Sequence, residues 1–89
     1  MKKDIKKRAL RRLKIAEGQI RGLERMVEGE EYCVDIIQQS LAVKNALSGV
    51  EDLILENHLG THVVHQMKSG KTQKAIDEIL SMYRLSKRT

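Results

Sequence analysis

A single apolar pattern of helical period runs through residues 31–67 of an 89-residue chain that contains no proline. A helix of that length would extend roughly 55 Å at about 1.5 Å per residue, which is more than the width of a globule of this size. Its apolar face is also wider than one partner helix can cover. We therefore expect one all-α domain over residues 1–89 that associates with copies of itself. The apolar positions are Ile36, Val43, Leu47, Val50 and Ile54, widened by Ile37, Leu41, Leu53, Leu55, Leu59, Val63 and Val64.

Two further helices complete a predicted three-helix protomer. The first covers residues 4–28, with Gly29 as its stop. Gly70 ends the long second helix, and Thr72 is a candidate N-cap for a short third helix. We expect the tail, 85–89, to be frayed. The apolar face of the third helix consists of Ile76, Ile79, Leu80 and Tyr83.

The formal net charge of +5 points to a polyanionic partner, with nucleic acid ahead of an anionic membrane surface. No run of about 18 apolar residues is present, so we expect no membrane span. The N-terminal charges are not followed by an apolar stretch, and Cys33 is the single cysteine. These features favour a cytoplasmic protein.

The first helix carries apolar residues on one face and basic residues on the opposite face. Its apolar face consists of Ala9, Leu13, Ala16, Ile20, Leu23 and Val27. Its basic face consists of Lys7, Arg11, Lys14, Arg21 and Arg25, flanked by Arg8 and Arg12. A solvated charged face is the ordinary alternative, but the near absence of acids there favours DNA binding. No helix-turn-helix pattern is evident.

His58 and His62 are four residues apart and would project from the same side of a helix, where two imidazoles can bind one metal ion. A surface or interface histidine pair is the open alternative, and whether His65 adds a ligand is undecided. Cys33 is either a ligand or a small buried hydrophobe.

Cys33 lies 25 residues before His58, or roughly 37 Å along one continuous helix, so the two cannot meet within a chain. If two long helices pack antiparallel, Cys33 of one subunit can approach His58 and His62 of its neighbour, and symmetry gives two equivalent sites per dimer. One thiolate and two imidazoles favour Cu(I). Zn(II) would want a fourth ligand, and Ni(II) or Co(II) would want more nitrogen and oxygen donors.

An enzyme is not expected, because two or three helices offer little room for a pocket with an oxyanion hole.

A more specific indication of function comes from a set of residues around the thiol and the histidines. They are Tyr32-Cys33-Val34-Asp35, Gln39, Ala42-Val43, His58-Leu59 and His62. With them the chain resembles, over residues 8–83, the copper-sensing operon repressor (CsoR) family of bacteria. Nickel/cobalt, formaldehyde and persulfide sensors belong to the same family.

The resemblance implies a dimer built as an antiparallel four-helix bundle, and a tetramer made of two dimers. It implies a repressor that holds double-stranded operator DNA when metal-free and releases it on binding its inducer. Tyr32 and Glu78 match a pair thought to couple the bound histidine to the DNA face. Arg12 falls on a DNA-contact position of the family, and Lys44 matches a basic position of the nickel/cobalt branch.

Departures from the family pattern indicate which branch of the family this chain resembles. Copper sensors typically use Cys, His and Cys, whereas His62 occupies the third position here. That histidine also disfavours persulfide sensing, which needs a thiol there, and Lys2 replaces the proline of formaldehyde sensors. The early histidine of nickel/cobalt sensors is absent, although the run from His58 to Gln66 is similar to theirs.

The leading hypothesis is therefore a copper-responsive repressor with one Cu(I) per protomer, shared between subunits. The alternatives are the same repressor tuned to nickel, cobalt or zinc, and a basic helical protein that binds DNA architecturally without an inducer.

Overall fold

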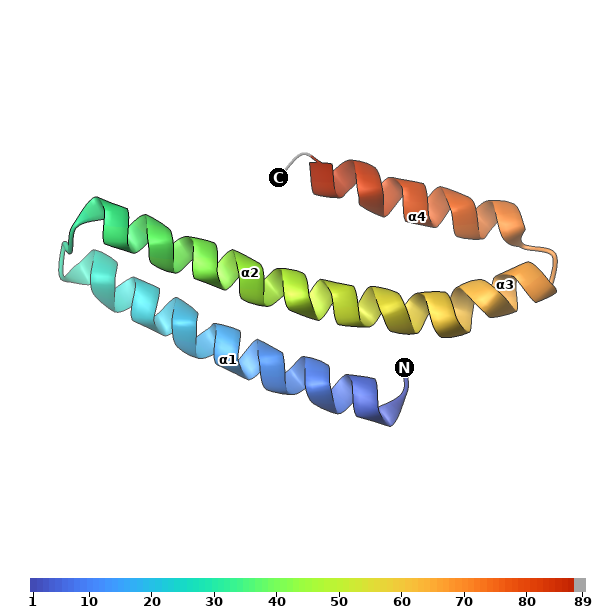
Figure 1. The fold of residues 1–89 in the computed structure, drawn as a ribbon, viewed down its shortest axis with the longest axis horizontal. Helices are drawn as coiled ribbons and strands as arrows, with labels where there is room; N and C mark the ends of the chain where they lie inside the picture. The colour runs from blue at the N-terminus through green and yellow to red at the C-terminus, as the bar shows by residue number, and fades with distance from the viewer. Residues whose placement is uncertain (88–89) are drawn as a thin grey trace. The chain divides into compact units, whose positions relative to one another are not determined.

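The computed structural model describes residues 1–87, and these form helices joined by two turns (Figure 1). The elements in chain order are α1 (Lys3–Glu28), α2 (Cys33–His58), the π-helical η1 (Leu59–Val63), α3 (Val64–Lys68) and α4 (Thr72–Lys87). Residues 1–87 contain no strand, which confirms the all-α prediction. No helix within them is long and apolar enough to cross a membrane.

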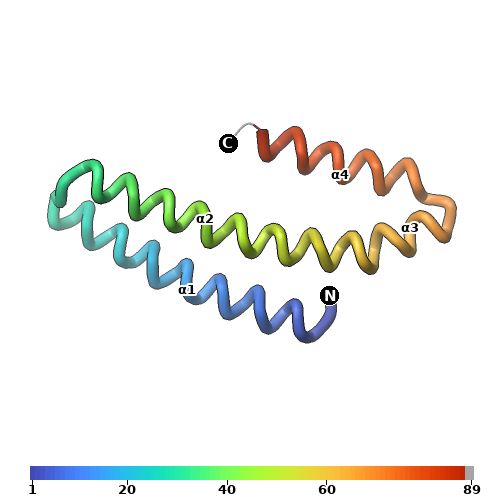
Figure 2. Tube along the Cα trace, viewed as in Figure 1, coloured from blue at the N-terminus to red at the C-terminus, as the bar shows by residue number. Residues whose placement is uncertain are grey.

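The chain divides into two compact units, Met1–Leu55 and the part that begins at Glu56. In the first unit, α1 and α2 up to Leu55 lie side by side and run antiparallel (Figure 2). In the second unit, the chain reverses direction after α3, and α4 packs against α3. That residues 1–89 form a single domain stays a prediction.

The core of the first unit is small. Ala9 of α1 packs against Val50 and Leu53 of α2, and Ile5 covers this cluster. Because alanine is small, Ala9 contributes little apolar area to this contact. Ala16 and Val43 are the other buried apolar residues of this unit.

Two side chains also join α1 to α2 through main-chain oxygens. Arg12 Nη1 donates to the carbonyl of Gly49 at 3.0 Å, and Gln39 Nε2 donates to the carbonyl of Gln19 at 3.4 Å. Helical carbonyls retain a second lone pair beyond their i+4 bond, so these bonds add interhelical contacts without breaking either helix.

Most of the predicted apolar stripe stays accessible in the isolated protomer. Ile20 and Val27 of α1 are 39% and 56% exposed, and Leu47 and Ile54 of α2 are each 38% exposed. No large side chain in the described part of the chain is fully buried. The physical reason is geometric, because α1 covers only one side of α2 and leaves the rest of the wide apolar face open.

α1 ends where the sequence predicts, but the left-handed residue is not the glycine. Gly29 has φ −80°, and Glu30 adopts φ 49°. The N–H groups of Glu30 and Glu31 donate to the carbonyls of Val27 and Met26, both at 3.0 Å. This is the Schellman pattern, which satisfies the last carbonyls of the helix.

α3 ends in the same way at a glycine. Gly70 has φ 82°, its N–H donates to the Met67 carbonyl at 3.3 Å, and the Lys71 N–H donates to the Gln66 carbonyl at 2.6 Å. Gly70 is therefore the helix stop that the sequence predicts.

Three sequence-based predictions need correction. The long second helix is not α-helical throughout, because η1 interrupts it. Thr72 is the first residue of α4 rather than its N-cap, and the Lys71 carbonyl accepts the bond from the Ala75 N–H at 3.2 Å. The expected fraying of 85–89 is wrong for 85–87, where α4 continues to Lys87, and residues 88–89 lie outside the described part.

Introducing a glycine at one left-handed position and removing the glycine from the other should change the free energy of unfolding in opposite directions. We expect Glu30→Gly to raise the free energy of unfolding by about 0.5 kcal/mol, because a side chain disfavours that backbone conformation. Gly70→Ala should lower it by about 1 kcal/mol for the same reason. Urea unfolding at a fixed protein concentration measures both, and shifts of the same sign would contradict this account of the turns.

Candidate functional site

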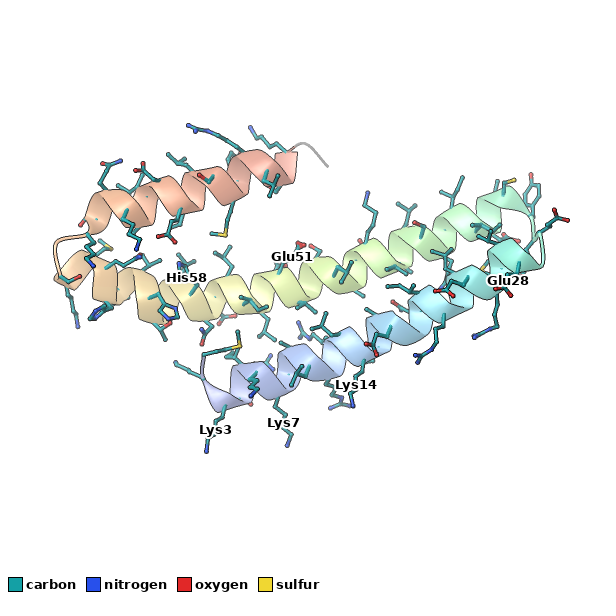
Figure 3. All side chains as sticks on the ribbon, turned by 180° about the vertical axis from the view of Figure 1, so that it is seen from behind. Lys3, Lys7, Lys14, Glu28, Glu51 and His58 are labelled. Atoms are coloured by element: carbon teal, nitrogen blue, oxygen red, sulfur yellow. The ribbon has the colours of Figure 1, made fainter. Side chains whose placement is uncertain are left out.

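The histidine pair occupies the junction between α2 and η1. His58 is the last residue of α2 and is half-buried, whereas His62 lies in η1 and is exposed. Their ring centroids are 5.2 Å apart, and the ring planes are tilted by 34°. Figure 3 shows the His58 ring projecting sideways from the helix. Two imidazoles at this separation provide adjacent nitrogen donors, as the spacing in the sequence predicts.

The π-helical turn between the two histidines is a feature that sequence reasoning missed. The hydroxyl of Thr61 donates to the carbonyl of Asn57 at 2.6 Å and lies 3.4 Å from His62 Nδ1. A threonine that bonds back to the carbonyl four residues earlier competes with the regular helix. π-Helical turns are rare and often occur at functional sites. The pair Gly60-Thr61 is the signal that could have indicated it.

Cys33 lies far along the same helix from the histidines. It is the first residue of α2, its thiol is free, and its side chain is exposed. The interpretation as a buried hydrophobe is therefore wrong for the protomer. Within residues 1–87, no group of three His, Cys, Asp or Glu side chains could hold a metal ion. One protomer thus offers a histidine pair and, separately, an exposed thiol.

The available donors fit a soft metal ion in type. A cysteine thiolate is a soft ligand, and imidazole suits copper, zinc and nickel. His65, on α3, is exposed as well.

Tyr32 and Glu78, the residues expected to couple metal binding to the DNA-binding face, have different surroundings. Tyr32 precedes α2 and is 72% exposed, and its carbonyl accepts bonds from the first turn of that helix. Glu78 is half-buried on α4, where its Oε1 accepts a bond from Gln66 Nε2 at 3.4 Å. The described contacts include no bond from Glu78 to His58, so that pairing stays a prediction.

The basic face of α1 is solvent-accessible over its whole length. Lys3, Lys7 and Lys14 project from α1 on the side away from α2 (Figure 3). The residues predicted to form this face are all exposed, and in the part of the chain that the structure describes none of them forms a salt bridge: Lys7, Arg11, Lys14, Arg21 and Arg25. The neighbouring Arg8 differs, since it pairs with Asp4 at 3.7 Å. Unpaired cations on one face are available to phosphates.

The two basic residues taken from the family resemblance lie on different helices. Arg12 is exposed, and its Nη1 donates a hydrogen bond to the carbonyl of Gly49. A guanidinium has five N–H donors, so the remaining donors can still contact a phosphate. Lys44 is exposed on α2.

A basic, all-helical protomer with a histidine pair and an exposed thiol has the parts of a metal-sensing, DNA-binding regulator. The profile of one protein family, described as "Metal-sensitive transcriptional repressor", matches residues 5–84. The chain belongs to this family, which confirms the resemblance drawn from the sequence.

Individual relatives carry copper-sensing names. The copper-sensing transcriptional repressor CsoR of Bacillus subtilis is 44% identical over 73 residues, covering 82% of this chain and 72% of that protein. The protein of the same name from Mycobacterium ulcerans is 42% identical, over 86% of this chain and 66% of its own length. Among solved structures, the copper-sensing repressor CsoR with Cu(I) from Geobacillus thermodenitrificans has a TM-score of 0.86 and 32% identity, covering 96% of this chain and 88% of that one.

Proposed function

We propose that this protein is a Cu(I)-responsive transcriptional repressor, which binds operator DNA when metal-free and releases it when Cu(I) binds. The observation that carries the proposal is the pair of imidazoles 5.2 Å apart, on the same continuous helical run as a free, exposed thiol. The relatives named for copper sensing support the same metal. They are transcriptional repressors, and we propose no catalytic activity for this chain.

The proposed metal ligands are Cys33 from one protomer and His58 and His62 from a second protomer. A continuous α2 keeps the thiol and the imidazoles apart within one chain, so a shared site needs two antiparallel chains. Bound Cu(I) would supply a soft, low-coordinate centre that links the two subunits, with one ion per protomer.

The proposed oligomer is a dimer formed as an antiparallel four-helix bundle, which pairs into a tetramer. Its support is the apolar surface that the protomer leaves open, including Leu47 and Ile54 of α2. A chain of this size with so small a core gains stability by burying that surface against further copies.

The proposed DNA interface is the basic face of α1, together with Arg12 and Lys44. These side chains would contact phosphates of double-stranded operator DNA, which explains why the charges lie on one face and lack acidic partners. Because the repressor must reach that DNA, we also propose a cytoplasmic location.

The coupling between the two sites is proposed to pass through Glu78, with Tyr32 beside the thiol in the same network. A histidine that binds metal through one ring nitrogen usually donates its other N–H to an acceptor that fixes the ring. Glu78 is the proposed acceptor for His58, so that metal binding would draw α4 towards the histidine pair.

A second candidate keeps the same repressor and changes the inducer to nickel, cobalt or zinc. The observation that favours it is the nitrogen donor of His62 where copper sensors typically have a thiol, with the exposed His65 nearby in sequence. Competition of Ni(II), Co(II) and Zn(II) against Cu(I), read by DNA release, separates the two. Failure of every metal to release DNA would leave an architectural DNA-binding protein.

Self-association is testable in solution. We expect the parent protein to sediment as a dimer or a tetramer at micromolar concentration, and Leu47→Glu to shift it towards monomer by placing a charge in the apolar face. Ser48→Glu, one residue on and exposed, is the matched control and should leave the oligomer intact. A parent protein that sediments as a stable folded monomer would remove the shared site.

Metal binding should require residues from two chains. We expect Cys33→Ala and His58→Ala each to abolish tight Cu(I) binding when assayed alone. If the two variants are unfolded and refolded together, random pairing restores about a quarter of the sites, because each mixed dimer regains one of its two sites. Competition with a Cu(I) chelator measures the recovered fraction. Mixtures that recover nothing would show that the ligands are not shared.

DNA affinity should depend on the basic face of α1. Arg11→Glu should weaken operator binding and lower the log–log salt slope by about 0.9, because the substitution removes one cation that neutralises a phosphate. Lys74→Glu makes the same charge change on α4 and is the control. Fluorescence anisotropy over a range of salt concentrations measures both variants. Equal effects from the two substitutions would mean that net charge alone is responsible.

A further inference from the structure

A polar pair joins α3 to α4 within the second unit. The side-chain amide of Gln66, on α3, donates through Nε2 to Oε1 of Glu78, on α4, at 3.4 Å, and both side chains are half-buried. Glu78 is the acceptor proposed above for the metal-bound histidine. Whatever holds its carboxylate therefore affects that role.

The chemistry of the pair fixes the orientation of the amide. A carboxylate is an acceptor only, so the NH₂ group of Gln66 must face Glu78, since the flipped amide would set two acceptors against each other. The amide oxygen consequently points elsewhere. It is buried and has no hydrogen-bond partner among the residues that the structure describes.

An unpaired buried oxygen makes glutamine a poor choice for packing alone. Among the hydroxyls of neighbouring residues in the sequence, that of Thr61 donates to the Asn57 carbonyl and that of Ser69 donates to the main-chain carbonyl of Gln66, not to its side chain. An apolar side chain of similar shape, such as methionine, would fill the same space without burying an unsatisfied acceptor. The bond to Glu78 is the one interaction that methionine could not make.

We infer that Gln66 is a positioning residue for Glu78 and so a part of the allosteric coupling, an inference that rests on the proposed function. Its amide occupies Oε1 of the carboxylate and restricts the rotation of that side chain. The second oxygen, Oε2, remains able to accept an N–H from a histidine ring. The metal signal thus needs Gln66 even though this residue binds neither metal nor DNA.

The test compares substitutions that keep or remove the donor. Gln66→Met removes it, and Gln66→Lys keeps a donor towards Glu78 while eliminating the orphan oxygen. The matched control is Gln73→Met, because Gln73 donates to Asp77 at 2.8 Å in an exposed pair within α4. Glu78→Ala serves as the reference for a protein without the coupling.

Three quantities are measured for each variant: operator affinity with and without Cu(I), Cu(I) affinity, and thermal unfolding of the metal-free protein. Allosteric couplings commonly change affinity by about 5- to 150-fold. We expect Gln66→Met to reduce the Cu(I)-dependent fall in DNA affinity to within about twofold of the Glu78→Ala value. Metal-free DNA affinity and Cu(I) affinity should stay unchanged, and the unfolding temperature should be equal or higher. Gln66→Lys and Gln73→Met should retain release.

The outcomes separate this inference from the proposed function. If Glu78→Ala loses release and Gln66→Met keeps it, Gln66 is not a positioning residue, whereas the proposed route through Glu78 stands. If Glu78→Ala itself keeps release, the proposed route fails first. A Gln66→Met protein that unfolds at a lower temperature and loses metal-free DNA binding would show a purely structural role. A metal-free side-chain amide NMR signal of Gln66 that does not move in Glu78→Ala, which removes the acceptor, would also overturn the inference.

Discussion

The continuous backbone hydrogen bonding of α2 is the constraint on which the rest of this structure depends. A helix from Cys33 to His58 is stiff, and it keeps its first and last residues apart whatever the side chains do. The only thiol of the chain and His58 thereby lie at opposite ends of one element, and His62 lies in the adjoining η1. A metal centre that uses both the thiol and the histidines cannot be completed inside a protomer. Metal binding at such a centre would therefore require two subunits to associate. The sensor proposed here follows from that separation.

The same helix accounts for the thin core. Its apolar residues surround more of its circumference than α1 covers, so only a few, such as Val50 and Leu53, are buried against α1. Lys3, Lys7 and Lys14 project from α1 on the side away from α2, whereas Arg12 reaches across to Gly49 of α2 (Figure 3). The proposed DNA interface and the proposed subunit interface would therefore use largely different side chains.

Polar contacts add to this apolar packing at a few specific positions. The Thr61 hydroxyl donates to the Asn57 carbonyl in the π-turn between the two histidines, and Arg12 Nη1 donates to the carbonyl of Gly49. Gln66 and Glu78 join α3 to α4 beside a buried oxygen that lacks a partner among the described residues. The Thr61 and Gln66 contacts each carry a cost in regular bonding or burial, and such local departures are expected at functional sites.

The sequence alone determined the helices, their stops at Gly29 and Gly70, the basic face of α1 and the histidine pair, because periodicity, turn residues and charge are local properties. Sequence motifs also indicated the family. Tertiary structure decided that the left-handed residue is Glu30, that a π-turn separates the histidines, and that Glu78 is bonded to Gln66. The first two depend on local hydrogen bonds that compete with regular helical bonding, and the third depends on how α3 packs against α4. The apolar pattern of the sequence records neither.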